Sequence, residues 1–407
     1  MHGTTSTAVA GAGRPRVVRS LVRQERRSAF GIGMQSLIAW RNLSHERVRL
    51  VITLVGVAFS VALIAIQLGL LVGFAETASS IVDLAGADVW IAARGTRNVD
   101  EAVEISERAL YRASSTPGVA AADPYIVHFA AWKRPDGGSE SVNLVGFDLE
   151  RGVGAPWNLV EGSVQDLKQP DAVIVDVVYK ERLGISRVGE TVEINRHRAR
   201  IVGFTQGIRA FTQSPYVFTS LQNARAFSGY PGDELTYVLV RTTAGANPSA
   251  VRTTLAGRLP VYDVWSADGF SAQTRYYWLF TTGAGIALVI GALLGLIVGA
   301  VIVGQTLYAN TIERLPEYGM LRAMGASGRY LHAIVVRQAA ISAVFGSAIG
   351  LLITLALVHA ARLSTVALVL PLPLAIGVAA ATVMMCVGAA LVSIRKLTRL
   401  DPAKLFQ

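Results

Sequence analysis

Four stretches of this chain contain no charged residue, and each is long enough to cross a lipid bilayer. They are Leu50–Ala75, Tyr276–Ile312, Gln338–Ala361 and Leu363–Ile394. A spanning helix needs roughly 20 apolar residues, because the hydrocarbon core is about 30 Å thick. The chain between the first two stretches is polar and charged, as in a soluble domain. The sequence therefore predicts one membrane helix, a large domain, and then three clustered membrane helices.

The distribution of charge predicts how these helices are oriented. Only 16% of the residues are charged, and the formal net charge is +10. The basic excess lies before Leu50, in the segment Glu313–Arg329 and after Ile394, whereas the large domain holds slightly more acidic than basic residues. Excess Lys and Arg beside membrane helices mark the cytoplasmic side. We therefore expect a multi-pass protein of the inner or plasma membrane, with both termini cytoplasmic and the large domain outside. The basic excess does not predict nucleic-acid binding.

These signals divide the chain into eight segments. The expected fold class is a membrane α-helical protein of four transmembrane helices, with an α+β extracytoplasmic domain between helices 1 and 2. The transmembrane helices are expected at 50–75, 278–304, 338–361 and 371–394. The other segments are a basic cytoplasmic segment at 1–49, the outer domain at 76–275, a cytoplasmic coupling loop or helix at 305–331 and a cytoplasmic tail at 395–407.

The outer domain alternates helical and strand-like patterns. Glu101–Ser114 and Ala250–Leu259 have the apolar spacing of helices. Asn195–Arg198 is a candidate hairpin turn, because an alternating run precedes it and a second apolar run follows it. Runs bounded by Gly, Pro, Asp or Asn predict strands at Val142–Phe147, Ala172–Val175, Val188–Ile194, Ala199–Phe204, Tyr216–Thr219 and Tyr237–Arg241.

The sequence offers little that could carry out catalysis. It has no glycine-rich phosphate loop ending in Gly-Lys-Ser/Thr, so the chain is not expected to hydrolyse ATP itself. No histidine pair has metal-ligand spacing, and the single cysteine, Cys386, lies in the fourth apolar stretch. We therefore predict no catalytic residues, no metal site and no cofactor on this chain.

Glycines recur at intervals of four along two of the apolar stretches. Small residues at this spacing let helix backbones approach closely in lipid. The pattern predicts a helix-packing face but leaves open whether it joins two subunits or two helices of one subunit. The glycines are Gly291, Gly295 and Gly299 in the second stretch, and Gly346 and Gly350 in the third.

The segment after the second stretch carries a resemblance to a known family. Glu313-Arg314, followed by Glu317-x-Gly319-x-Leu-Arg322-Ala-x-Gly325-Ala, is similar to the loop after the second span in the MacB/FtsX superfamily of ABC-transporter permeases. That superfamily also includes the LolC/LolE subunits. The tail Leu400–Ala403 also resembles the usual C-terminal end of the superfamily. The likeness to DevC-type permeases within it is carried by Ala39–Leu43, His45–Leu50, Gly56–Phe59, Gln67–Gly69, Ala87–Trp90, Arg108–Tyr111, Pro117–Val119, Trp132–Lys133 and Gly146–Asp148.

The spacing of this segment also predicts a short amphipathic helix. Ile312, Leu315, Gly319, Met320, Ala323 and Met324 fall on one side, and charged residues surround it. Such a helix can insert its apolar face into a groove of a partner, or it can lie on the lipid surface. With the resemblance, docking to an ATPase is the favoured interpretation, and Arg47 and Arg49 are weaker candidates for the same contact. The expected coupling residues are Glu313, Arg314, Leu315, Glu317, Gly319, Met320, Arg322 and Gly325.

Two functions remain open at this level. The first is the permease subunit of an ABC complex, which would couple ATP hydrolysis on a partner to export or extraction of a lipid, glycolipid or lipopeptide. Its expected partners are an ABC ATPase dimer carrying ATP and Mg, a second permease copy or a paralogue, membrane lipid, and a membrane-fusion or adaptor protein. The second is an FtsX-like signal transducer that regulates a cell-wall hydrolase.

Overall fold

The computed structural model describes residues 47–212, 214–230, 232–362 and 364–398. Residues 1–46 of the predicted segment 1–49, which include the family-like Ala39–Leu43, and residues 399–407 of the predicted tail lie outside the described residues. The chain divides into two units. The first unit comprises residues 1–61, 298–351 and 376–407, and the second comprises residues 62–297 and 352–375.

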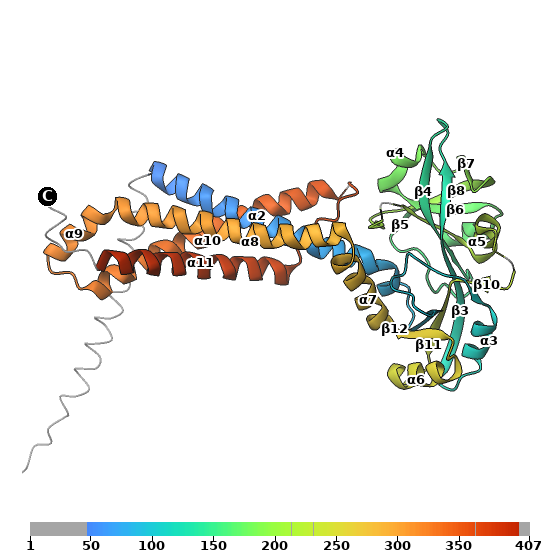
Figure 1. Cartoon of the computed structure of the whole chain (residues 1–407). Coiled ribbons are helices and arrows are strands. Elements are labelled where there is room, and N and C mark those ends of the chain that lie inside the picture. Colours follow the sequence, from blue (N-terminus) through green and yellow to red (C-terminus); the bar gives the residue numbers. More distant parts are fainter. Residues whose placement is uncertain (1–46, 213, 231, 363, 399–407) are drawn as a thin grey trace, which may run out of the picture. The chain divides into compact units, whose positions relative to one another are not determined.

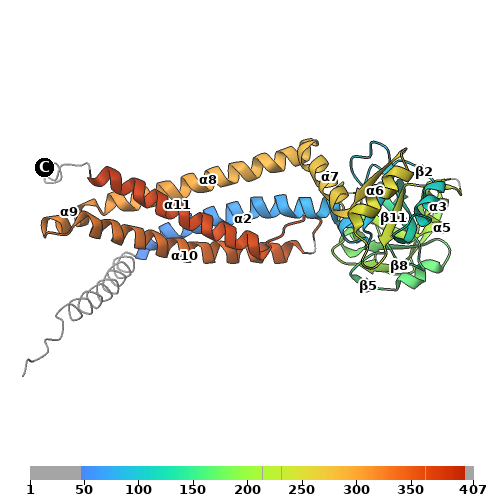
Figure 2. The same ribbon diagram turned by 90° about the horizontal axis from the view of Figure 1, so that it is seen from below.

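Four long helices account for the four charge-free stretches. They are α2 (Arg47–Asp83), α8 (Gly283–Glu313), α10 (Gly328–Ala361) and α11 (Leu372–Thr398). Each is long and apolar enough to cross a membrane, over Val48–Asp83, Gly283–Glu313, Gly328–Ala361 and Leu372–Ser393. The segments of these helices in the first unit lie side by side in both views (Figure 1, Figure 2). The predicted fold class, four apolar helices with a mixed domain between the first two, is confirmed.

The helix limits differ from the predicted span limits. α2 continues beyond Ala75 to Asp83, and its last turn places Ile81 and Val82 in the core of the outer domain. The charge-free stretch that begins at Tyr276 contains two helices, because α7 (Ala267–Phe280) ends just before α8 begins at Gly283. The first charged residue after an apolar stretch indicates where contact with lipid ends. The helix itself can continue further when it packs against protein, as the last turns of α2 do.

The domain between α2 and α8 is built on a ten-stranded mixed sheet in the second unit. The strand order is β12-β1-β11-β3-β4-β9-β6-β8-β5, and β7 pairs with both β3 and β8. The long β3 (Val119–Lys133) pairs with β11 (Tyr237–Thr242) along its first half and with β4 (Ser139–Phe147) along its second. The other strands of this sheet are β1 (Val89–Ala93), β5 (Leu159–Glu161), β6 (Ala172–Asp176), β7 (Thr191–Ile194), β8 (His197–Thr205), β9 (Tyr216–Ser220) and β12 (Tyr262–Ser266).

The sheet buries both of its faces, as β1 illustrates. Alternate residues of a strand point to opposite faces. Val89 and Ile91 join the apolar cluster formed with α3 (Arg108–Ser114) and α6 (Pro248–Arg258). Trp90 and Ala92 join the opposite cluster, which contains Phe270 of α7. Helices α4 (Lys180–Leu183) and α5 (Leu221–Ser228) cover a third cluster, against β4, β6 and β9.

The predicted strands are found at β4, β6, β7, β8, β9 and β11, with limits shifted by a few residues. The hairpin between β7 and β8 is present, but its turn is shorter than predicted: Ile194 pairs with His197, and Asn195 and Arg196 both have positive φ. The helix predicted from Glu101 is wrong in its first half. Ile105–Ser106 form β2, which pairs with β10 (Glu234–Leu235), and α3 begins only at Arg108.

Candidate coupling site around α9

A short helix, α9 (Leu315–Ala323), follows α8 after a break at Arg314. Pro316 accounts for the break, because proline has no N–H and its ring clashes with the carbonyl four residues earlier, which prevents α8 from continuing. Gly325 ends α9 with φ +94°. The N–H groups of Gly325 and Ala326 bond to the carbonyls of Arg322 and Leu321, each at 3.0 Å. This is the pattern of a helix stop built around a left-handed residue.

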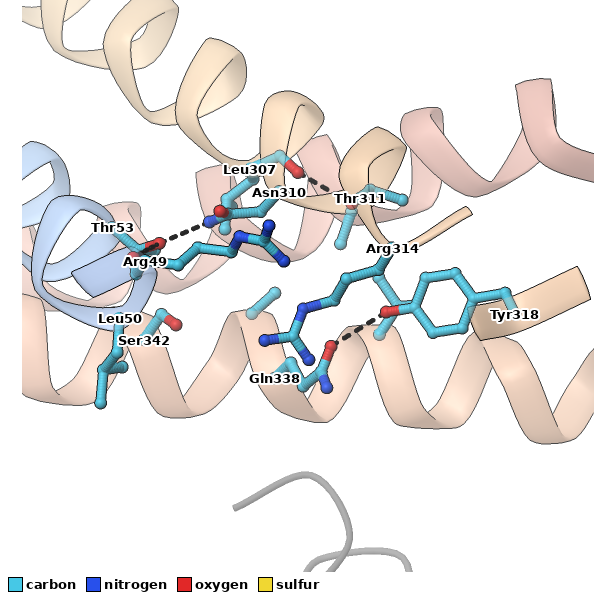
Figure 3. A pocket seen from close by; sticks show the side chains of 13 residues that line it. Arg49, Leu50, Thr53, Leu307, Asn310, Thr311, Arg314, Tyr318, Gln338 and Ser342 are labelled. Atoms are coloured by element: carbon cyan, nitrogen blue, oxygen red, sulfur yellow. Dashed lines mark hydrogen bonds between the residues drawn. The ribbon is translucent and has the colours of Figure 1, made fainter. Parts of the chain in front are cut away.

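Polar side chains tie α9 and the end of α8 to neighbouring helices of the first unit (Figure 3). Tyr318 is 4% exposed, and its hydroxyl donates to Gln338 Oε1 of α10 at 3.1 Å. The amide of Asn310 on α8 donates to Thr53 Oγ1 of α2 at 2.5 Å. α9 is therefore attached to α10, and the end of α8 to α2, by buried or half-buried hydrogen bonds.

An ion pair and a buried arginine complete the site. Arg49 of α2 lies 3.0 Å from the Glu313 carboxylate at the end of α8. Arg314 is only 6% exposed and lines a small cavity with Asn310, Tyr318 and Gln338. In Figure 3 its side chain reaches toward Gln338. Burial raises the pKa of Tyr318 to about 12, which agrees with the enclosed position of its hydroxyl.

Six of the eight predicted coupling residues fall into two groups by exposure, and the other two are Glu313 and Arg314, described above. Met320, Arg322 and Gly325 are exposed, as are Ile312 and Met324 beside them. Leu315, Glu317 and Gly319 are half-buried. The apolar side predicted from spacing is thus largely exposed on the first unit, where a partner can reach it.

One detail of the predicted helix is wrong. Glu313 does not share a helix with Glu317 and Arg322, because the backbone breaks at Arg314, and Glu313 pairs with Arg49 of the same chain. Arg314 is buried, and its predicted coupling role stays a prediction. The pattern also missed Tyr318 and its partner Gln338, because a lone tyrosine in a short helix gives no sign of which residue it will meet. The side chain of Arg47 lies outside the described residues.

The glycines of the long helices pack against α2 of the same chain. In the second unit, a Cβ added at Gly295 would lie 2.9 Å from Gln67 Cγ, and one at Gly291 would lie 3.3 Å from Gln67 Oε1. In the first unit, a Cβ at Gly350 would lie 2.6 Å from the Ala58 carbonyl oxygen, and one at Gly346 would lie 2.5 Å from Val57 Cγ1. Gly299 is buried in α8. These contacts account for four of the five glycines by packing within one chain.

Two family models match this chain. The MacB-like periplasmic core domain matches residues 50–257, and the FtsX-like permease C-terminal model matches residues 289–402. The first alone covers just over half of the chain. This chain is an ABC transporter permease of the MacB/FtsX type. It is a multi-pass membrane subunit with an extracytoplasmic domain, and membership of this family implies an ATPase partner.

Relatives described as permeases cover most of this chain, and solved structures resemble part of it. An uncharacterized ABC transporter permease of Mycobacterium tuberculosis is 24% identical over 90% of this chain and 98% of its own. One of Mycobacterium bovis is 25% identical over the same shares. The periplasmic region of MacB from Actinobacillus actinomycetemcomitans is 15% identical, over 45% of this permease and 90% of that chain, with a TM-score of 0.36. The extracellular domain of YknZ from Gram-positive bacteria is 12% identical, over 44% and 99%, with a TM-score of 0.34.

The described residues contain no cluster of three or more His, Cys, Asp or Glu side chains that could hold a metal ion. Cys386 is fully buried in α11. The candidate site is an exposed short helix that is hydrogen-bonded to the neighbouring α10.

Proposed function

We propose that α9 is the docking helix for a separate ABC ATPase, and that this permease uses ATP hydrolysis on that partner to export or extract a hydrophobic or amphipathic substrate on the outer side of the membrane. The observation that carries the proposal is the contrast along α9. Tyr318 is anchored to α10 at 3.1 Å, whereas Met320 is 56% and Met324 76% exposed.

This contrast suits a coupling element. Exposed methionines adapt to apolar grooves of varied shape, and Arg322 beside them can fix the register of docking by charge. A displacement of α9 would be transmitted to α10 through the hydrogen bond between Tyr318 and Gln338. The adjoining end of α8 is attached to α2 through Arg49–Glu313 and Thr53–Asn310. Movement of the ATPase would therefore be shared among three membrane helices.

The partners follow from the same mechanism. ABC ATPases act as dimers, so we propose two copies of this permease, or one with a paralogue, on two ATPase chains, with a membrane-fusion or adaptor protein outside. α9 and both termini would be cytoplasmic, in an inner or plasma membrane. The DevC-like character rests on the family resemblance. The substrate class rests on that resemblance and on the absence of charged residues in the four predicted spans. A small ion or polar solute would need polar partners there.

The test uses the full complex in nanodiscs. Met324→Asp places a charge on the exposed side of α9, and we expect a roughly tenfold weaker ATPase interaction, equivalent to about 1.4 kcal/mol, with loss of permease-dependent stimulation of hydrolysis. Ser327→Asp adds the same charge just after α9, at an exposed polar position, and serves as the matched control. Mass measurement of the complex gives the number of permease chains.

If Met324→Asp and Ser327→Asp leave ATPase binding and hydrolysis equally unchanged, α9 is a lipid-facing helix and the docking assignment is wrong. A deletion strain with unchanged envelope lipids and a cell-division defect would instead favour the FtsX-like regulatory function.

A further inference from the structure

The second unit contains a cavity of about 270 Å³ where α2, α8, the outer domain and the segment before α11 meet. This volume approaches the lower end of the range for small-molecule sites, roughly 300–1,000 Å³. Its lining is mostly hydrocarbon. The lining residues are Leu70, Phe74, Thr77, Tyr179, Arg182, Ala210, Phe211, Leu288, Thr365, Val366 and Ala367.

The cavity residues of α2 lie about one hydrocarbon thickness along the helix from Arg49. A helix rises 1.5 Å per residue, so Leu70 is about 30 Å along α2 from Arg49, which equals the thickness of the hydrocarbon core. Glu76 is the first acidic residue beyond it. Leu288 of α8 lies just inside the start of the second span, at Gly283. Two membrane helices therefore contribute their outer ends to this cavity.

Several polar groups in the lining already have partners. The Thr77 hydroxyl donates to the Gly73 carbonyl at 2.7 Å, and the Tyr179 oxygen accepts the Ala210 N–H at 3.0 Å. Arg182 is paired with Glu140 at 2.9 Å. A polar ligand would have to compete with these bonds, whereas a hydrocarbon chain would not.

An arginine of the outer domain bonds to the segment that forms one wall of the cavity. The Arg209 guanidinium donates to the carbonyls of Ala361, Arg362 and Ser364 at 3.2, 3.0 and 3.0 Å. The last carbonyls of a helix have no partner within it, so Arg209 caps the end of α10. This clasp fixes the segment Thr365–Ala367, which lines the cavity together with Phe74 and Phe211. The ring centroids of the two phenylalanines are 3.9 Å apart in an edge-on arrangement.

We propose that this cavity binds one acyl chain of an amphiphile from the outer leaflet. The inference rests on the proposed function, in which the substrate class is amphipathic, and it assigns a place on this chain where that class is held. The Arg209 clasp keeps the cavity formed by fixing the wall that follows α10.

The test reconstitutes the full complex, without nucleotide, in nanodiscs of phosphatidylethanolamine and phosphatidylglycerol that contain a phosphatidylglycerol with a diazirine in one acyl chain. After illumination, peptide mapping locates the label. We expect label on Leu70–Thr77 and on Thr365–Ala367, and we expect Val366→Trp to abolish it by filling the cavity. Val366 is half-exposed, so the larger ring can be accommodated without unfolding.

Val261→Trp is the matched control, because Val261 is similarly exposed on the outer domain and does not line the cavity. Ala210→Trp fills the cavity from the outer domain and must give the same loss as Val366→Trp. Equal labelling in wild type and both filled variants would mean ordinary lipid contact and would overturn the proposal. Cross-links from these segments to a second copy of the chain, without lipid label, would also overturn it.

This outcome is independent of ATPase docking, since labelling needs no hydrolysis. Normal labelling with a failed Met324→Asp test would leave the acyl site standing and remove only the docking assignment.

Discussion

The indole N–H of Trp278 donates to the Asp100 carboxylate at 3.2 Å. The other carboxylate oxygen accepts from the Tyr216 hydroxyl at 2.7 Å and from the Asn143 amide at 3.1 Å. Trp278 belongs to α7, directly before α8, whereas Tyr216 and Asn143 belong to the central sheet. One buried carboxylate thus joins the sheet to the helix that leads into the second span.

This relationship predicts a pH dependence. Burial, with a smaller contribution from the neighbouring Glu101, raises the pKa of Asp100 to about 6 from 3.8, while its hydrogen bonds oppose the shift. Between these values the folded chain binds more protons than the unfolded chain, so stability falls as pH rises, by about 3 kcal/mol in total. Asp100→Asn should remove this decline. Unfolding of the full chain in detergent, followed by tryptophan fluorescence from pH 4 to 7, measures it.

Asp268→Asn is the control for this experiment, because Asp268 is an exposed carboxylate on α7, the helix that carries Trp278. It should keep the wild-type pH profile. The same decline in Asp100→Asn as in wild type would show that Asp100 does not titrate in this window.

The close approach of α10 to α2 predicts a strong effect at one glycine. Gly350→Ala would place a Cβ 2.6 Å from the Ala58 carbonyl oxygen, so the helices must separate, at a cost of about 1–3 kcal/mol. Gly377→Ala in α11 has no neighbouring atom within 4 Å and should be close to neutral. Thermal unfolding in detergent compares the two. Equal stability would mean that α2 and α10 are not packed at Gly350.

The anchor of α9 predicts a local effect. Tyr318→Phe removes the hydroxyl that bonds Gln338, which should cost about 1 kcal/mol and raise hydrogen exchange of the α9 amides about fivefold, without global unfolding. Tyr330→Phe, a half-buried tyrosine at the start of α10, is the matched control and should leave exchange in α9 unchanged. Unchanged exchange in both variants would contradict the anchoring role.

Orientation follows from the basic flanks of the helices. A tag inserted at Gly138, in the turn between β3 and β4, should be reached by a membrane-impermeant reagent in intact cells. Tags at residue 5 and at Gln407 should be protected until the membrane is opened. Protection of the Gly138 tag would reverse the proposed topology.

Local signals in the sequence determined much of this protein. Apolar runs without charge predict membrane helices because no bilayer-spanning segment can leave its backbone unpaired. Alternation over Val188–Ile194 predicted a strand and its hairpin, since the period of side chains is a backbone property. The residues Glu317, Gly319, Arg322 and Gly325 suggested the family that the matching models show.

Contacts between distant residues decided the rest. Ile105 and Ser106 leave the helical pattern around them to pair with β10, more than a hundred residues later. Glu313 meets Arg49 and Tyr318 meets Gln338 only once the helices are packed. The sequence left open whether the glycines pack between subunits or between helices of one chain. In the structure, four of them pack against α2 of the same chain. Periodicity is set by neighbours in sequence, whereas the partner of a buried polar group is set by which elements pack together, and no local pattern encodes that choice.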